Sequence, residues 1–452
     1  MKKLPIFLLV ILFAANGSVQ SKGSSNARLD SLMEYYNQTF NYNGVAMVSS
    51  KGQTLLKKGY GYMDRYKNTR NHANNVFMIG SITKQFTAEL ILMLAKENKL
   101  TLQDKLSKYY PEYPSGDRIT IENLLTHTSG IYNYTEDTIW KRHPTSSLTH
   151  DQMISIFKDK PLEFEPGTKF EYSNSGYILL TYIIEKITQK PYTVFAREQI
   201  LTPLGMNHSG FDYTHLKDRR KVTSYEGVII DSFYVAKIED STQSLGAGAL
   251  YSTVDDLYKW HRALQSYQLL DRDWQQKAYT TFKGNYGYGW FIAEGFYGQK
   301  VLAHSGGISG FYTYFSRIEK EDLCIILLAN VASNGIDLNE ISKNIVRCLY
   351  DTSFKIPAVR KEINLSRSKL ISYAGEYVLV DDTSTSIKFD LNGKYLYFTV
   401  TNQPVERAYP QSPNLFFVKT ADVQFEFIED KNRQYKILLH QGGQKMEAIR
   451  RR

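Results

Sequence analysis

Residues 77–84 read Phe-Met-Ile-Gly-Ser-Ile-Thr-Lys, and they lead directly into a helical pattern whose apolar side chains fall on one stripe. Residues three apart on a helix share a face, so this SxxK spacing brings the Lys84 amine to the Ser81 hydroxyl. The start of a helix also presents unpaired backbone N–H groups and the positive end of the helix dipole, which favour an oxyanion. The stretch therefore predicts a serine nucleophile, assisted by a lysine, for acyl transfer.

Two other SxxK matches occur in the chain, and their surroundings suit chemistry less well. Ser155 and Lys158 fall within a helical pattern, whereas Ser366 and Lys369 fall in a stretch that connects two regions. We interpret both matches as polar surface positions. The pentapeptide GxSxG does not occur in the sequence, which argues against an α/β-hydrolase.

Two further motifs follow Ser81 in an order that is more specific than any single motif. Both Tyr-x-Asn and His-x-Gly recur along the chain, so each alone is a weak signal. Only one combination places the serine and lysine on a helix, the middle motif in a loop of a helix-rich region and the last motif on a predicted strand. It consists of Ser81 and Lys84, then Tyr172 and Asn174, then residues 304–307. These two motifs and the serine on a helix form one ordered set.

This set resembles the serine β-lactamase and penicillin-binding protein superfamily, nearest its class C β-lactamase and D-alanyl-D-alanine carboxypeptidase branch. The similarity covers roughly Ala27 to Leu349. It includes the surrounding phrases Leu-Leu-Thr-His-Thr-Ser-Gly at 124–130, Glu-Pro-Gly at 165–167, Pro-Leu-Gly-Met at 203–206 and Gly-Ala-Gly at 246–248. Such motifs are confirmed by their structural context.

The resemblance implies the catalytic roles. Ser81 is expected to be the nucleophile, and Lys84, with a pKa lowered by desolvation in the cleft, to accept or relay its proton. Tyr172 is expected to be the companion acid/base. The oxyanion hole is expected to consist of the backbone N–H groups of Ser81 and Gly307.

The resemblance also implies a substrate-binding set. Asn174 is expected to bind the substrate amide and the catalytic lysine, and His304, Ser305 and Gly306 to bind substrate along a strand. A histidine stands here in place of the lysine of efficient class C β-lactamases, which weakens an antibiotic-resistance function. Because histidine is partly protonated near neutral pH, its attraction for a substrate carboxylate is expected to depend on pH. His127 is expected to shape a loop near the cleft rather than to react.

The patterns along the chain predict an α/β (α+β) fold with a β-lactamase/transpeptidase-like antiparallel sheet. A helix and a hairpin at the start are expected to join a later meander, with flanking helices and an inserted helical subdomain. The Asn392-Gly393 hairpin signal and alternating strands predict a small C-terminal barrel-like domain. The expected divisions are a signal peptide at 1–21, a hydrolase domain at 27–351, a linker at 352–364 and the β domain at 365–452.

Composition and the N-terminal residues indicate a globular, exported protein. Of 452 residues, 42% are hydrophobic and 22% are charged. Lys2 and Lys3 precede a short apolar run, the pattern of a signal peptide, and the run is shorter than the roughly 20 residues of a membrane span. We expect a periplasmic or extracellular protein with no stable membrane span after cleavage. Without the 2 leader lysines the net charge falls from +9 to +7. The basic residues are interspersed with acidic residues along the sequence, which argues against nucleic acid as a partner.

The sequence predicts no metal and no cofactor. It lacks CxxC and HExxH motifs, and an acyl-enzyme needs only side chains and water. Cys324 and Cys348 are expected to be buried thiols. The expected substrates are small peptide-like amides or esters, with D-amino-acid peptides such as peptidoglycan fragments among them. A carboxylesterase, a weak class C-like β-lactamase and a non-catalytic penicillin-binding sensor remain open alternatives.

Overall fold

The computed structural model describes residues 22–142, 145–229, 232–295, 298–331, 337–431, 434–441 and 444–451. The predicted signal peptide, residues 1–21, lies outside the described residues. Within these ranges, no helix is both long enough and apolar enough to cross a membrane. The same ranges hold no group of three or more His, Cys, Asp or Glu side chains placed to bind a metal ion.

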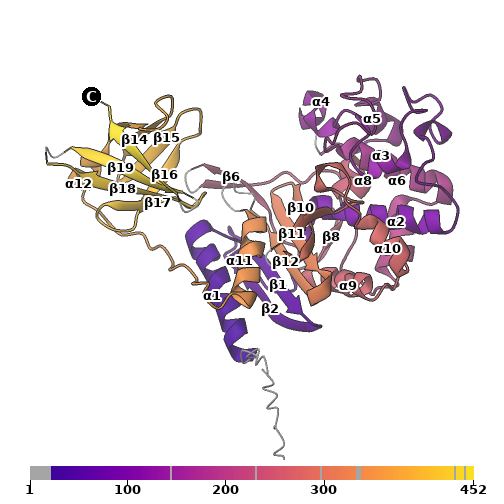
Figure 1. Cartoon of the computed structure of the whole chain (residues 1–452), viewed down its shortest axis with the longest axis horizontal. Helices are drawn as coiled ribbons and strands as arrows, with labels where there is room; N and C mark the ends of the chain where they lie inside the picture. Colours follow the sequence, from indigo (N-terminus) through magenta and orange to yellow (C-terminus); the bar gives the residue numbers. More distant parts are fainter. Residues whose placement is uncertain are drawn as a thin grey trace, which may run out of the picture.

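An antiparallel sheet of six strands lies at the centre of the first part of the chain, in the order β2-β1-β12-β11-β10-β9 (Figure 1). Its strands are β1 (Gly44–Ser50), β2 (Gln53–Tyr60), β9 (Phe291–Glu294), β10 (Lys300–Ile308), β11 (Phe311–Ile318) and β12 (Leu323–Ala329). The register pairs Gly44 with Ala329, so the N-terminal hairpin joins the later meander, as the sequence predicts. β12 is buried along its whole length, which explains its unbroken apolar sequence.

Helices cover both faces of this sheet. α1 (Lys22–Phe40) and α11 (Leu338–Tyr350) pack side by side on one face and share a core with it (Figure 1). A second and larger core forms between the other face and the inserted helical block. Strand side chains alternate between the two faces, so neighbouring residues on one strand belong to different cores. Cys324 on β12 and Cys348 on α11 are buried free thiols, as predicted.

The inserted block is mainly helical. Its helices are α2 (Thr83–Lys96), α3 (Ile121–Leu125), α4 (Thr138–Arg142), α5 (His150–Ser155), α6 (Asn174–Thr188), α7 (Tyr192–Ala196), α8 (Ser241–Gly248), α9 (Val254–Gln265) and α10 (Arg272–Ala278). Short strands also pair here: β3 (Tyr62–Asp64) with β4 (Thr69–Arg70), β5 (Phe77–Met78) with β8 (Tyr251–Ser252), and β6 (Tyr225–Ile229) with β7 (Ser232–Val235). Ser155 is exposed at the end of α5, so its SxxK match is a surface feature, as interpreted.

One strand begins later than the sequence pattern indicates. The apolar run from Tyr288 to Ile292 predicts a strand, but β9 starts only at Phe291. The reason is Gly289, whose φ is +78° and where a β-carbon would lie 2.8 Å from the Lys84 carbonyl oxygen. The backbone therefore passes close to α2 in a conformation that suits glycine and not a strand.

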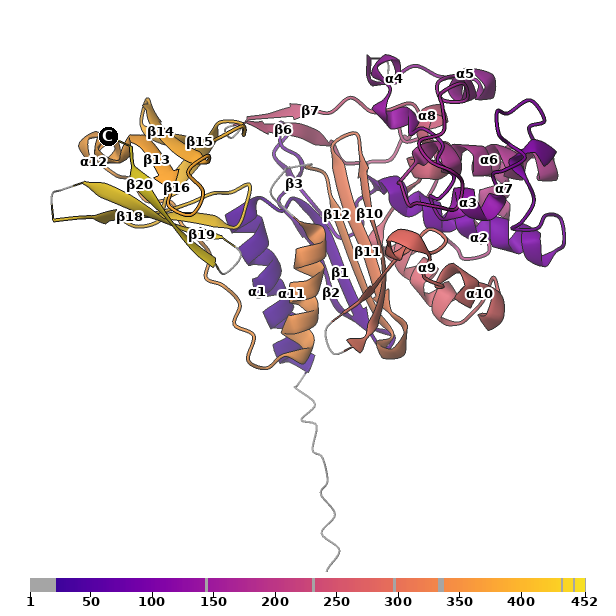
Figure 2. The same cartoon turned by 45° about the horizontal axis from the view of Figure 1, so that its top comes forward.

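The C-terminal region is a closed barrel of eight strands (Figure 2). These are β13 (Gly375–Leu379), β14 (Ser386–Asn392), β15 (Tyr395–Val400), β16 (Glu406–Pro410), β17 (Leu415–Phe417), β18 (Val423–Glu429), β19 (Tyr435–Gln441) and β20 (Gln444–Arg450). Buried aromatic and aliphatic side chains fill its interior. The helix α12 (Arg367–Tyr373) precedes the barrel, and the Ser366 hydroxyl accepts a hydrogen bond from the Lys369 N–H as its N-cap. That SxxK match is therefore a helix cap.

The barrel lies beside α1, on the side of the sheet away from the helical block (Figure 2). Arg360 in the connecting segment joins the two regions. Its guanidinium pairs with Asp422 of the barrel and lies 5.4 Å from the ring centroid of Phe40 at the end of α1. The Ile363 N–H also donates to the Pro410 carbonyl oxygen on β16 at 2.8 Å.

Candidate active site

Ser81 lies in a 3₁₀ turn, Gly80–Ile82, that directly precedes α2. The Thr313 hydroxyl on β11 donates to the Ile79 carbonyl oxygen at 2.8 Å and ties this turn to the sheet. Gly80 has a φ of +55°, and a β-carbon there would lie 2.8 Å from the Gly307 nitrogen on β10. The turn can approach β10 this closely only because position 80 has no side chain.

The Lys84 side chain is buried, and its Nζ makes three hydrogen bonds. Its partners are Ser81 Oγ at 3.0 Å, Asn174 Oδ1 at 2.8 Å and the Ala247 carbonyl oxygen at 2.7 Å. Burial lowers the pKa of Lys84 well below its ordinary value of 10.5, which favours the neutral amine. The amide and carbonyl oxygens can only accept, so they take both N–H donors of a neutral amine. The lone pair of the Lys84 nitrogen is then free to accept a hydrogen bond from the Ser81 hydroxyl.

Tyr172 comes from the loop that precedes α6, and it is partly buried beside Ser81. Lys84 Nζ lies 5.0 Å from the centroid of the Tyr172 ring. Burial raises the pKa of Tyr172 above its ordinary value of 10.0, and a hydrogen bond with the Ser81 side chain opposes part of that rise. The phenol therefore keeps its proton near neutral pH, which suits a general acid more than a base.

Asn174 is the first residue of α6, and a neighbouring loop holds it in place. The Asn133 side-chain oxygen accepts from the Asn174 backbone N–H at 3.0 Å and from its Nδ2 at 3.4 Å. The Ser175 hydroxyl donates to the Tyr132 carbonyl oxygen at 2.7 Å. These bonds satisfy polar groups at the helix start and orient the Asn174 amide toward Lys84.

The predicted oxyanion hole lies at an open edge of β10. β9 pairs with β10 only from Lys300 to Ala303, and none of the described strands pairs with that edge from His304 to Ile308. Gly307 lies in this open stretch, beside the turn that holds Ser81, and a β-carbon on it would meet nothing within 4 Å. A substrate carbonyl oxygen between the two backbone N–H groups can accept from both, and an extended substrate can lie along the edge.

His304 differs from the expectation. It is buried, with the Tyr286 hydroxyl 2.9 Å from Nε2 and the Ser305 carbonyl oxygen 2.6 Å from Nδ1. A carbonyl can only accept, so we assign the proton to Nδ1, and Nε2 accepts from Tyr286. Burial is the main cause that lowers the pKa of His304 to about 3. The expectation that this histidine is partly protonated near neutral pH is therefore wrong.

The side chains of the histidine motif do not share one face of the sheet. Gly306 pairs with Thr313, whose hydroxyl donates to the Ile79 carbonyl oxygen beside the Ser81 turn. Ser305 pairs with Tyr314, whose hydroxyl donates to Asn339 Oδ1 on α11 at 2.8 Å. Because directly paired residues point to the same face, the Ser305 hydroxyl lies on the α11 face. Its role in substrate binding stays a prediction.

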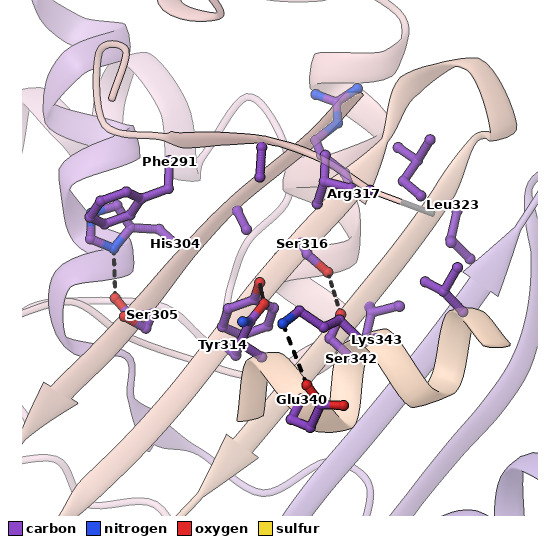
Figure 3. A pocket seen from close by; sticks show the side chains of 18 of the residues that line it. Phe291, His304, Ser305, Tyr314, Ser316, Arg317, Leu323, Glu340, Ser342 and Lys343 are labelled. Atoms are coloured by element: carbon purple, nitrogen blue, oxygen red, sulfur yellow. Dashed lines mark hydrogen bonds and ion pairs between the residues drawn. The ribbon is translucent and has the colours of Figure 1, made fainter. Parts of the chain in front are cut away.

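A cavity of about 640 Å³ lies on this α11 face (Figure 3). Ser305 and Tyr314 on the sheet and Glu340 and Lys343 on α11 form part of its wall. The Ser316 hydroxyl on β11 lies 3.0 Å from the Ser342 hydroxyl on α11 and bridges the two walls. His304 also lines this cavity, whereas Lys84 and Tyr172 are not among its lining residues.

Two groups in the site were not predicted: Tyr286 and the Ala247 carbonyl oxygen. The sequence leaves open whether Asn133 lines the substrate side or lies in an ordinary exposed loop, and the structure places it against Asn174. A signal existed for Ala247, because a β-carbon on the preceding Gly246 would lie 2.3 Å from the Thr181 hydroxyl. The Gly-Ala-Gly phrase at 246–248 therefore requires small residues. Tyr286 meets His304 across 18 residues, and no local pattern marks such a contact.

The family model described as Beta-lactamase matches residues 29–344. The putative penicillin-binding protein PbpX of Bacillus subtilis (strain 168) is 31% identical over 317 residues, which cover 70% of this chain and 77% of that protein. Penicillin-binding protein 4* of the same organism is 25% identical over 453 residues, which cover 95% of this chain and 99% of that protein.

A solved structure is similar over both regions of the chain. The octameric penicillin-binding protein homologue from Pyrococcus abyssi has a TM-score of 0.66 and 23% sequence identity. The match covers 93% of this chain and 99% of that chain. At this identity the likeness concerns the fold, and it extends from the six-stranded sheet to the barrel.

Proposed function

Because the chain belongs to the Beta-lactamase family, we propose that it is an exported serine hydrolase that forms an acyl-enzyme at Ser81. Its substrates are peptide-like amides or esters, including cell-wall peptides with a D-amino acid. The name of Penicillin-binding protein 4*, a relative over nearly the whole chain, supports this substrate class. The signal-peptide pattern at residues 1–21 supports export to the periplasm or the extracellular space.

The contact between Lys84 and Ser81 is the observation that carries this proposal. The buried Lys84 amine is hydrogen-bonded to two oxygens that can only accept, those of Asn174 and Ala247. Its nitrogen also lies 3.0 Å from Ser81 Oγ, so it is placed to remove the proton of that hydroxyl. A lysine that merely filled space would leave its ammonium buried without a counter-charge, which is unfavourable. The arrangement therefore fits an activated nucleophile.

The proposed reaction uses only groups of the described site and water. Ser81 Oγ attacks the substrate carbonyl carbon while Lys84 Nζ takes its proton, and the oxyanion accepts from the Ser81 and Gly307 N–H groups. As the bond to the leaving group breaks, Tyr172 gives that group a proton and regains one from Lys84. Water then attacks the acyl carbon and passes a proton to Lys84, which returns it to Ser81 Oγ as the acyl group leaves.

The neutral His304 favours one alternative over another. β-Lactams and peptides that end in D-alanine carry a carboxylate, and a histidine with a pKa of about 3 offers no cation for it near neutral pH. Amides and esters without a free carboxylate do not need that cation. We therefore propose amidase or esterase activity ahead of β-lactamase activity.

Intact-protein mass spectrometry after exposure to a fluorophosphonate and, separately, to a fluorescent penicillin tests the proposal. We expect a fluorophosphonate adduct on the wild-type protein and none on Ser81→Ala. Ser155→Ala is the matched control, because its SxxK match is on the surface, and it should be labelled like the wild type. Equal labelling of Ser81→Ala, or no labelling of the wild type by either reagent, would refute an acyl-enzyme at Ser81.

A further inference from the structure

His127 lies beside Tyr172 and makes an unusual set of contacts for a loop residue. It follows α3 with a φ of +55°, and only 2% of it is exposed. A left-handed backbone is unfavourable for a residue with a β-carbon, so the surrounding contacts must hold it. The Leu125 carbonyl oxygen, two residues earlier, accepts from the Tyr177 hydroxyl at 2.9 Å, which anchors this loop to α6.

Two hydrogen bonds connect His127 to the backbone N–H groups of the residues before and after Tyr172. The Glu171 N–H donates to the His127 carbonyl oxygen at 3.0 Å. The Ser173 N–H donates to His127 Nδ1 at 3.2 Å. The backbone before and after Tyr172 is therefore bound to one residue.

The His127 ring also covers the Tyr172 ring. The ring centroids are 4.2 Å apart with an interplanar angle of 33°, and the Tyr286 ring lies 4.7 Å from His127 on another side. This stack limits rotation of the phenol and excludes water from the face that it covers. His127 thus restrains both the backbone and the side chain of Tyr172.

The protonation of His127 agrees with this arrangement. Nδ1 accepts a hydrogen bond, so the proton of the neutral ring is on Nε2, which has no hydrogen-bond partner in the described part of the chain. Burial is the main cause that keeps the pKa of His127 well below 6.5. A ring that only filled space would be better as phenylalanine, which buries no unpaired N–H. The acceptor nitrogen is the feature that phenylalanine lacks.

We propose that His127 is a positioning residue that holds the Tyr172 phenol in line with Ser81 and Lys84 during acyl transfer. This inference rests on the proposed function, because it assigns His127 a part in the same reaction. His127 acts through Tyr172 and does not touch the substrate. Its loss therefore lowers the rate of acylation and leaves substrate binding nearly unchanged.

Two substitutions separate the contributions of His127. His127→Asn keeps an acceptor near Nδ1 and tolerates a positive φ, but it removes the ring. His127→Phe keeps a ring and removes the acceptor. We expect both to lower the acylation rate at saturating substrate by roughly tenfold to a hundredfold, with KM changed by less than about threefold. In His127→Asn, water reaches Tyr172 and lowers its raised pKa, so the alkaline limb of the pH–rate profile moves to lower pH.

A double-mutant cycle and a control variant make the test specific. In a Tyr172→Phe background, His127→Asn should have little further effect, since its partner is already absent. His261→Asn is the control, because His261 is a buried histidine whose Nε2 lies 3.0 Å from Asp322, away from the catalytic set. It should lower the melting temperature and leave the acylation rate unchanged. Additive effects in the cycle, or His127 variants with the wild-type rate and alkaline limb, contradict the inference.

A measurement on the wild-type protein covers the case in which the His127 variants do not fold. ¹⁵N NMR of the histidines should show His127 as the neutral Nε2–H tautomer that does not titrate between about pH 5 and pH 8. A proton on Nδ1 overturns the inference, because Nδ1 could not then accept from Ser173. If the wild-type protein forms no adduct at Ser81, the proposed function fails, while the tautomer still decides the His127 contact.

Discussion

Gly80, the residue before Ser81, and Gly307, on β10, approach so closely that a β-carbon on Gly80 would lie 2.8 Å from the Gly307 nitrogen. The same nitrogen carries one of the two N–H groups of the proposed oxyanion hole. A side chain at position 80 would therefore push apart the two elements that form the hole. The absence of a side chain at position 80 is therefore a condition for the N–H pair that would stabilise negative charge in the transition state.

We predict that Gly80→Ala lowers kcat by roughly a hundredfold to a thousandfold, the effect of losing one oxyanion donor. Gly205→Ala is the matched control, since Gly205 has a similar φ of +64° and open space around a β-carbon. Both variants should lose about 1–2 kcal/mol of stability from the left-handed backbone. Only Gly80→Ala should lose activity, as steady-state kinetics and thermal melts can establish. Equal activity in the two variants would contradict the assignment of the oxyanion hole.

Lys84→Arg should lower kcat by about 10²–10⁴-fold, because a guanidinium stays protonated and cannot accept the Ser81 proton. The wild-type rate should fall toward acid pH as Lys84 gains a proton, and this limb should lie below the range of an ordinary lysine, since burial lowers its pKa. Lys58→Arg, which can keep the ion pair with Asp30, should behave like the wild type. A pH–rate profile of all three proteins checks these expectations.

The charge state of His304 predicts how substrate preference responds to pH. With a pKa of about 3, this histidine stays neutral between about pH 5 and pH 8. The ratio of kcat/KM for a peptide with a free carboxylate to kcat/KM for its amide should then be constant over that interval. A ratio that rises toward acid pH, with an inflection near 6.5, would indicate a protonated histidine at the substrate.

The same histidine makes stability depend on pH in a defined direction. Its pKa is about 3 in the folded state and about 6.5 when unfolded, so below 6.5 the unfolded state binds more protons. Its contribution is fully present above pH 6.5 and is lost as pH falls toward 3, with a slope of at most roughly 1.4 kcal/mol per pH unit. The neutral variant His304→Gln should therefore show a smaller drop in melting temperature between about pH 7 and pH 4. An unchanged drop would argue against a buried neutral imidazole.

Arg360 should stabilise the contact between the barrel and α1. Arg360→Ala removes the pair with Asp422 and the contact with the Phe40 ring, and we expect a loss of about 1–2 kcal/mol, because this side chain is only 11% exposed. Arg451→Ala is the control, since its pair with Glu376 is 66% exposed on the arginine side and should contribute little. Thermal unfolding followed by calorimetry checks both variants. Equal losses would show that the Arg360 contact has no special weight.

Much of the fold could be predicted because local patterns report local structure. Alternating apolar residues and the Asn392-Gly393 turn predict the β14–β15 hairpin, and the register pairs Asn392 with Tyr395 as expected. The unbroken apolar run at residues 323–328 is strand-like in the sequence, and the structure shows β12 there, buried along its whole length. The start of β9 was misplaced, because the approach of Gly289 to α2 depends on a contact between distant segments.

In the candidate site, too, the local pairing could be predicted and the contacts between distant segments could not. The SxxK spacing was enough to pair Ser81 with Lys84, since residues three apart meet on any helix start. The charge of His304 could not be predicted in this way, because it depends on burial among rings and on Tyr286. His127 was expected to shape a loop, and only the packed structure shows that it brackets Tyr172.

The order of residues along the chain was thus sufficient to pair Ser81 with Lys84 and to predict the antiparallel sheet with its appended barrel, because backbone periodicity and short spacings act over a few residues. Only tertiary packing decided the burial of His127 and His304, the face on which Ser305 lies and the contacts that His127 makes around Tyr172. Desolvation and side-chain contact depend on neighbours that are distant in sequence. These neighbours meet only when the two faces of the sheet have been covered.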